Sequence, residues 1–167
     1  MNFREGDWVM HCTYGLGKII RVEERTIYGP QMLYYAVQIG DMTVWVPSDD
    51  RLEKRLRAPT RGDKFQSLRD ILSGSGETLP ADRHERKEML SEWLQDGRAE
   101  SLCRVIRSLA SYQQVRSLND NDQVLMKRTQ HALIAEWGHS LAITTAQAEH
   151  EMHLLLVSNA SPQKSKA

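Results

Sequence analysis

Two glycines near the start of the chain limit its fold more than any other feature of the sequence. Gly15 and Gly17 lie between two short apolar-rich segments, residues 8–12 and 18–24. A tight reversal between strands requires residues that tolerate a positive φ, and glycine does so without steric cost. The segment after Gly17 has the pattern of a strand, whereas a phosphate-binding loop needs a helix directly after its glycines. The pattern predicts paired strands and excludes a nucleotide-binding loop.

Two more strands follow in the first third of the chain. Residues 32–39 alternate, with the odd-numbered apolar positions on one face. Gly40 reverses the chain, residues 42–46 form the next strand, and Pro47 ends it. Short strands separated by frequent turns are typical of a small β-barrel. The interior of such a barrel is filled by side chains, so it acts by presenting a surface or an edge strand.

The rest of the chain is predicted to be helical. After a polar stretch at residues 48–57 and a connector at residues 58–60, apolar residues recur with helical spacing and predict five helices. Glycines end three of them, at Gly74, Gly97 and Gly138. Three helices also begin with a pair of capping side chains three residues apart, and these pairs are Asp82 with Glu85, Asn119 with Asp122 and Thr144 with Gln147.

Charge and composition restrict the function. The chain carries 22 basic and 22 acidic side chains, so its formal net charge is zero. A protein that binds duplex DNA through its own field should be basic, and tight independent DNA binding is therefore not expected. The absence of a long apolar run and of a signal-peptide pattern predicts a cytoplasmic protein with no membrane partner. Cys12 and Cys103 are expected to be buried or unreactive thiols without a disulfide.

The opening stretch carries a set of residues at the spacing of a known family. They are Phe3, Gly6, Asp7, Val9, His11, Tyr14, Gly15, Gly17, Ile19, Glu23, Arg25, Ile27, Gly29, Tyr34, Tyr35, Met42, Val46 and Pro47. With them the stretch resembles the CarD/CdnL transcription regulators, which share this domain with transcription-repair coupling factors. The helical remainder is similar more loosely, by helix order and by Gly97 and Leu118 between helices.

The resemblance implies an α+β protein with two domains. Residues 1–58 would form a small SH3- or Tudor-like β-barrel that docks on the β subunit of bacterial RNA polymerase. Residues 62–157 would form an all-helical domain of about five helices, which in better-known members touches promoter DNA beside the melted region. Residues 158–167 are expected to be a disordered polar tail.

The resemblance also places the polymerase contact on the edge strand that holds Arg25, with Thr26 and Ile27 beside it. Strand addition supplies affinity through the backbone, and an arginine can grip a carboxylate bidentately. The alternative is an ordinary solvated arginine. Trp45 stands where well-known relatives carry a basic residue, and it is either an aromatic anchor for the partner or a core residue.

For DNA, some relatives use a tryptophan wedge at the start of the second helix, a place that corresponds to the region near Arg83. No aromatic residue lies between Glu77 and Met89, so the sequence does not support a wedge. Residues 101–119 contain three arginines and no acidic residue. Such a set is either a phosphate-contacting patch or a solvated face. The candidates for DNA contact are Arg83, Arg104, Arg107 and Arg116, with Lys127 and Arg128 as an extension.

Nothing in the sequence indicates catalysis. His150 and His153 are three residues apart, which is not the zinc-protease spacing, and no third ligand is evident. His11 is expected to be packed and hydrogen-bonded. The nucleophile-elbow and P-loop motifs are absent. We therefore expect a non-enzymatic protein without cofactor, metal or small-molecule substrate.

The leading hypothesis is a CarD-like regulator that docks on RNA polymerase and modulates promoter open-complex formation, with weak promoter DNA contacts made inside that complex. Docking compensates for the neutral surface because it raises the local DNA concentration. The alternative is a polymerase-docked adaptor whose helices bind another protein. A third hypothesis is that the protein is an enzyme, and only the scattered histidines support it.

Overall fold

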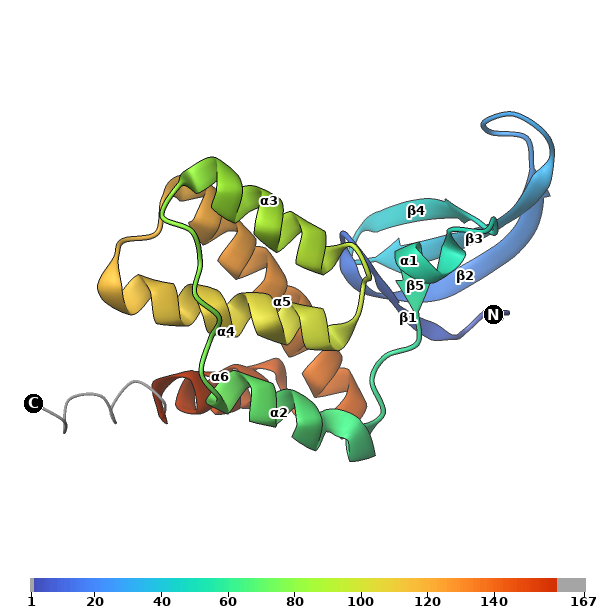
Figure 1. Ribbon diagram of the computed structural model, residues 1–167. Helices are drawn as coiled ribbons and strands as arrows, with labels where there is room; N and C mark the ends of the chain where they lie inside the picture. The colour runs from blue at the N-terminus through green and yellow to red at the C-terminus, as the bar shows by residue number, and fades with distance from the viewer. Residues whose placement is uncertain (1, 159–167) are drawn as a thin grey trace, which may run out of the picture. The chain divides into compact units, whose positions relative to one another are not determined.

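The structure is a computed structural model that describes residues 2–158, and its contacts divide the chain into two units, Met1–Pro59 and Thr60–Ala167 (Figure 1). Each unit buries a hydrophobic cluster of its own. Among the described residues, no helix combines the length and the apolar character that crossing a membrane requires.

The first unit is an antiparallel sheet of five strands in the order β4-β3-β2-β1-β5. Its hydrophobic cluster combines Val9, Ile19, Val37 and Val46 from one face of the sheet with Leu52 from a one-turn helix. Tyr34 and Ala36, which alternate with the cluster residues on β3, are buried on the other face. The elements are β1 (Trp8–His11), β2 (Gly15–Arg25), β3 (Met32–Ile39), β4 (Met42–Pro47), α1 (Leu52–Arg55) and β5 (Leu56–Arg57).

The sheet is not closed into a barrel. Over residues 2–158, β4 pairs only with β3 and β5 only with β1, so both end strands have a free edge. The predicted α+β class is confirmed, but a closed barrel is not. The sequence also missed α1 and β5, because Leu52 and Leu56 are the only apolar residues in a stretch of charged side chains.

The two glycines of the first turn act in different ways. Gly15 has φ +88°, the conformation expected for the reversal between β1 and β2. Gly17 lies inside β2 opposite Val9, and its role is steric. A Cβ atom on Gly17 would lie 2.6 Å from Cγ1 of Ile39 and 2.7 Å from Cγ1 of Val37. The requirement there is a close approach of β3, not a positive φ.

The second unit contains five α-helices within the described residues, as predicted, and a short 3₁₀ helix at Gly62–Lys64. The helix α4 contacts α2, α3 and α5, and its inner face is fully buried at Cys103, Val105, Ile106 and Leu109. The helices are α2 (Phe65–Ser73), α3 (Arg83–Leu94), α4 (Ala99–Val115), α5 (Asp120–Leu141) and α6 (Thr145–Ser158).

The predicted helix caps are present. The Asp82 side chain accepts a hydrogen bond from the Glu85 amide, and Asn119 and Asp122 form a reciprocal capping box. Thr144 and Gln147 likewise exchange side-chain-to-backbone bonds before α6. One predicted end is wrong, because α5 continues through Gly138 to Leu141. Its C-cap residue, Ala142, adopts a left-handed conformation with φ +53°.

The end of the chain differs from the predicted tail at one position. Ser158 is the last residue of α6, and residues 159–167 lie outside the described residues.

Candidate functional site

The second half of β2 is an edge strand. Pairing with β1 covers only residues 15–18, whereas pairing with β3 extends to Arg25. The register shifts between Ile19 and Arg21, where Ile20 is 48% exposed. Within residues 2–158, the stretch from Ile20 to Arg25 therefore pairs with a strand on one side only. A row of unpaired backbone groups of this kind is a template for an added strand.

Arg25 is held in place at the end of this edge. Its guanidinium lies 3.9 Å from the centroid of the Trp45 ring, across β3, and its Nε donates to Glu23. Glu23 also lies 3.8 Å from Nη1 of Arg21. The Arg25 side chain nevertheless stays 41% exposed. An arginine that is stacked and oriented in this way loses less freedom when it binds a carboxylate.

Trp45 is not part of the hydrophobic core of the sheet. It pairs with Ala36 on β3, whereas the core side chains Tyr35 and Val46 point to the opposite face. Trp45 is half-buried and forms the platform on which Arg25 rests. Of the two alternatives that the sequence left open, the buried-core role does not apply.

The loop after β2 presents apolar side chains next to Arg25. Thr26 is exposed, Ile27 is 38% exposed and Tyr28 is 84% exposed. Exposed large apolar side chains beside an arginine are typical of protein interfaces. The structure thus brings the four predicted docking residues, Arg25, Thr26, Ile27 and Trp45, to one end of the sheet.

The arginines proposed for DNA contact are dispersed over the helical unit. Arg104 forms an ion pair with Glu77, donating from Nη2 to Oε1 at 2.7 Å, and its guanidinium lies 3.8 Å from the centroid of the Trp93 ring. The hydrogen bond from Arg104 lowers the pKa of Glu77, and the same bond raises the pKa of Arg104. Arg104 is therefore engaged within the protein.

Arg107 does not lie on the surface, so it belongs neither to a phosphate-contacting patch nor to a solvated face, the two alternatives that the sequence left open. Arg107 is 2% exposed, and burial lowers its pKa. Its Nη1 donates to the carbonyl oxygens of Leu72 and Leu156, each at 3.1 Å, and Nε and Nη2 donate to Oγ of Ser111. Arg107 thus satisfies carbonyl groups near the C-terminal ends of α2 and α6, a structural role.

The other two candidates are exposed and lie at different places. Arg83 is the first residue of α3 and lines a groove with Arg128 of α5. Arg116 follows the end of α4 and lines a separate groove with Glu77. Within residues 2–158 neither arginine forms an ion pair. The four arginines therefore do not form one basic patch.

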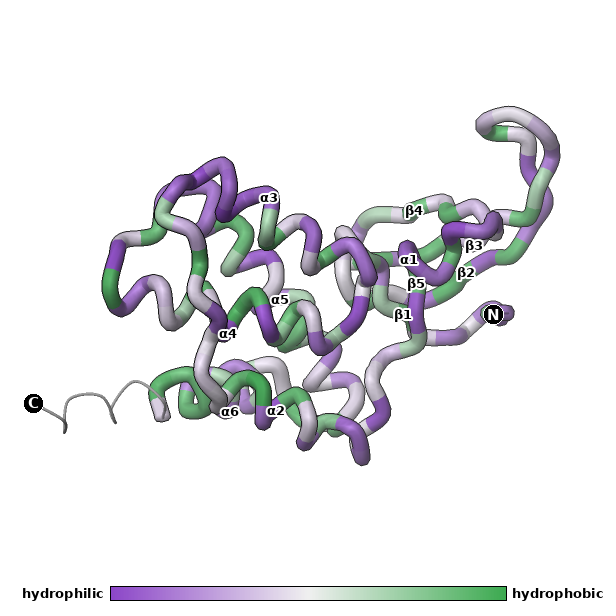
Figure 2. The backbone as a smooth tube through the Cα atoms, in the orientation of Figure 1, coloured by the Kyte–Doolittle hydropathy of each residue, from purple (hydrophilic) through white to green (hydrophobic). Residues whose placement is uncertain are grey.

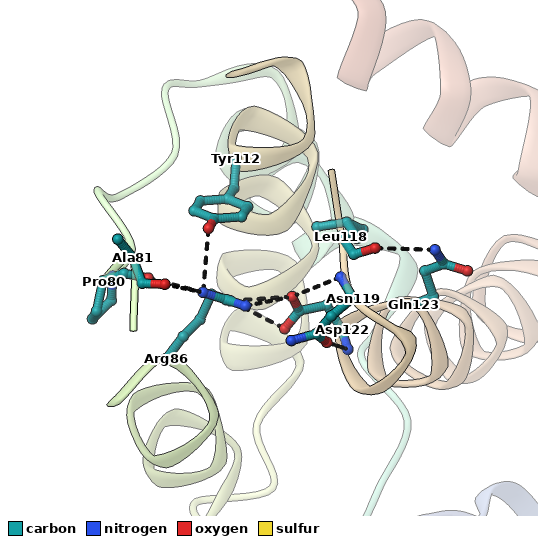
Figure 3. Close-up of polar contacts among 8 residues, drawn as sticks. All are labelled: Pro80, Ala81, Arg86, Tyr112, Leu118, Asn119, Asp122 and Gln123. Atoms are coloured by element: carbon teal, nitrogen blue, oxygen red, sulfur yellow. Dashed lines mark hydrogen bonds and ion pairs between the residues drawn. The ribbon is translucent and has the colours of Figure 1, made fainter. Parts of the chain in front are cut away.

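Sequence reasoning missed a buried network around Arg86 (Figure 3). Arg86 is 3% exposed and donates to both carboxylate oxygens of Asp122, at 2.8 to 3.1 Å. It also donates to the carbonyl oxygens of Pro80 and Ala81 and to the Tyr112 hydroxyl. The hydrogen bonds that Arg86 donates to Asp122 raise the pKa of Arg86. The network joins α3, α4 and α5, and Asp122 had been assigned only a capping role.

The histidines have structural or solvated positions. Nδ1 of His11 accepts hydrogen bonds from the amides of Thr13 and Tyr14, at 3.0 and 3.2 Å. Burial, assisted by the charge of Arg55, lowers the pKa of His11. Among the described residues, no group of three or more His, Cys, Asp or Glu side chains is placed to hold a metal ion. Cys103 is buried and Cys12 is exposed, so of the two alternatives stated for the cysteines, burial applies to Cys103 only.

A small sheet with an open edge, an oriented arginine and flanking apolar side chains defines a protein-interaction module. The sequence of this module identifies its family. Residues 3–58 match the family model of the CarD-like/TRCF RID domain, so the N-terminal unit belongs to the RNA polymerase-interacting domains that CarD-like proteins share with transcription-repair coupling factors. The resemblance seen in the sequence is confirmed over residues 3–58.

Proposed function

We propose that this chain is a CarD-like transcription regulator that docks on the β subunit of bacterial RNA polymerase through the free edge of β2. The observation that carries the proposal is the one-sided pairing of residues 20–25, next to an Arg25 oriented by Trp45. A strand of the polymerase adds to this edge, and an acidic side chain of the polymerase forms an ion pair with Arg25. Thr26, Ile27 and Trp45 supply the flanking contacts. The protein then acts in the cytoplasm, where the polymerase is.

In this proposal the docked protein modulates promoter open-complex formation. The helical unit lies near upstream promoter DNA, where tethering raises the local DNA concentration so that weak phosphate contacts become occupied. Of the four candidate arginines, Arg83 and Arg116 are exposed and form no ion pair among the described residues, and Arg104 contributes only if it exchanges Glu77 for phosphate. Binding one promoter state better than the other shifts the equilibrium between closed and open complexes.

Co-purification with RNA polymerase β tests the docking. We expect Arg25→Glu to lose capture, because the reversed charge repels the acidic partner and the cation–π contact with Trp45 is lost. Arg51→Glu is the matched control, since Arg51 is an exposed arginine of the same unit before α1, and it should retain capture. Capture that is equal for Arg25→Glu and the wild-type chain would refute the proposed docking edge.

A second candidate function is a polymerase-docked adaptor whose helical unit binds another protein. The positions of the arginines favour it, because Arg107 is buried and Arg104 is paired with Glu77. Cross-linking to promoter DNA within the polymerase complex separates the two functions. Loss of cross-links in an Arg83→Ala/Arg116→Ala variant supports the regulator that touches DNA. An absence of cross-links between the wild-type helical unit and DNA supports the adaptor.

A further inference from the structure

The helix α3 and the N-terminal half of α5 enclose a groove with a volume of about 540 Å³. Its rim is basic: Arg83 and Lys87 project from α3, and Arg128 projects from α5. All three side chains are exposed. Over residues 2–158, no carboxylate forms an ion pair with any of them.

The acidic side chain that reaches this groove is already neutralised. Asp122 lines the groove, but its two carboxylate oxygens accept hydrogen bonds from buried Arg86 (Figure 3). The charge that remains on the rim is therefore positive and has no partner within the described part of the chain. An anionic ligand would supply the missing counter-charge.

The groove also contains apolar surface. Leu90 is fully buried beneath it and Leu125 is half-buried. Val124 is 65% exposed, so an apolar side chain of the groove is open to solvent. A ligand that fits must combine negative charge with an apolar side chain. Amphipathic helices bind grooves in this way, with their apolar anchors at helical spacing.

The rest of α3 disfavours duplex DNA as the ligand. Glu85, Glu88 and Glu92 are exposed and are spaced three and four residues apart, so they form an acidic stripe on a different face of α3 from Arg83 and Lys87. Figure 2 shows α3 as a hydrophilic helix over most of its length. A broad polyanion lying across α3 would meet this stripe, whereas a narrow peptide inside the groove would not.

We propose that the α3–α5 groove, defined by Arg83, Lys87, Leu90, Val124, Leu125 and Arg128, binds an acidic amphipathic segment of a partner protein. Aspartate or glutamate side chains of the segment pair with the three cations, and a leucine-like side chain packs on Val124. This inference deepens the adaptor function and rests on it, because it gives the chemistry of the protein that the helices recruit.

The test is an NMR titration of the ¹⁵N-labelled full chain with three probes. The first is a synthetic peptide with glutamate and leucine at helical spacing, the second has glutamine at every glutamate position, and the third is a short DNA duplex. We expect the glutamate peptide to shift the backbone amides of Arg83, Lys87 and Arg128 and to bind at least about tenfold tighter than the glutamine peptide.

Charge reversal on the groove gives a matched pair of variants. Lys87→Glu should weaken binding of the glutamate peptide by about tenfold. Arg61→Glu makes the same change of charge on a side chain that is 80% exposed and does not line the groove, and it should change affinity by less than about twofold. Both substitutions are at exposed positions, and circular dichroism checks that both variants fold.

Three results would each overturn the inference: no binding of the glutamate peptide, equal binding of the two peptides, or preferential binding of the duplex at the same amides. The last result would instead support DNA contact by Arg83. Polymerase capture is measured separately on the wild-type chain and on Arg25→Glu. If the wild-type chain is captured but does not bind the glutamate peptide, only the groove is refuted. Capture that does not depend on Arg25 refutes the docking proposal whatever the peptide does.

Discussion

Replacing Asp122 by alanine should destabilise the helical unit severely. The Arg86 and Asp122 side chains are 4% and 6% exposed, so the substitution leaves a buried guanidinium without its carboxylate. Breaking a buried ion pair from one side costs about 3–5 kcal/mol. Asp122 also closes the capping box at Asn119, and loss of a cap adds up to about 1 kcal/mol. We therefore expect a loss of about 4 kcal/mol, a large part of the roughly 5–15 kcal/mol that stabilises a typical domain.

The assay is thermal and urea denaturation followed by far-ultraviolet circular dichroism, which the helices dominate. For a unit of this size, a loss of about 4 kcal/mol lowers the Tm on the order of 20 °C. Arg86→Met/Asp122→Leu removes both charges and should recover most of the loss, since an apolar pair of similar volume replaces a buried ion pair at little cost. Asp120→Ala, on an exposed neighbour in the same turn, should cost less than about 1 kcal/mol. Equal effects of Asp122→Ala and Asp120→Ala would refute the buried network.

Three further predictions concern the sheet. Gly17→Ala places a Cβ atom against Val37 and Ile39 and should cost about 1–3 kcal/mol, seen as faster hydrogen exchange of β2 amides; unchanged exchange would contradict the steric role. The lowered pKa of His11 means that the folded state holds this side chain neutral, so stability should be complete above the unfolded pKa of about 6.5 and fall as the pH drops below it. His11→Asn keeps an acceptor for the turn amides but does not titrate. The protection of the β1 amides against hydrogen exchange, corrected for the intrinsic exchange rates, should therefore lose this pH dependence in the variant. Trp45→Ala should weaken polymerase capture about twofold to fivefold by releasing Arg25, while Trp45→Phe should keep most of it; equal capture by all three proteins would argue against the platform.

Local patterns accounted for the elements that depend on neighbouring residues. Alternation predicted β3 with its observed bounds, Met32–Ile39, and pairs of polar residues predicted the caps at Asp82, Asn119 and Thr144. These features were predictable because a strand face and a helix cap are formed by residues within a few positions of one another. The N-terminal domain was recognisable for a related reason, since its residues recur at family spacing within one continuous stretch, residues 3–58.

Features that depend on distant segments were not predictable in this way. Arg104 and Arg107 look equivalent in the sequence, yet one lies on the surface beside Trp93 and the other is buried among the ends of α2 and α6. Helical spacing shows that two residues share a face, but it does not show how far a neighbouring helix covers that face. Arg86 was missed for the same reason, because its partner Asp122 lies 36 residues away.

From the sequence alone came the order of the first four strands and of the five long helices, the positions of most turns and caps, and the family of the N-terminal domain. The tertiary structure alone decided that the sheet stays open, that Arg25 rests on Trp45, and which arginines face water. The physical reason is that secondary structure and family motifs depend on residues that are close together in the sequence. Burial and charge pairing, in contrast, depend on which distant side chains arrive at the same place when the chain folds.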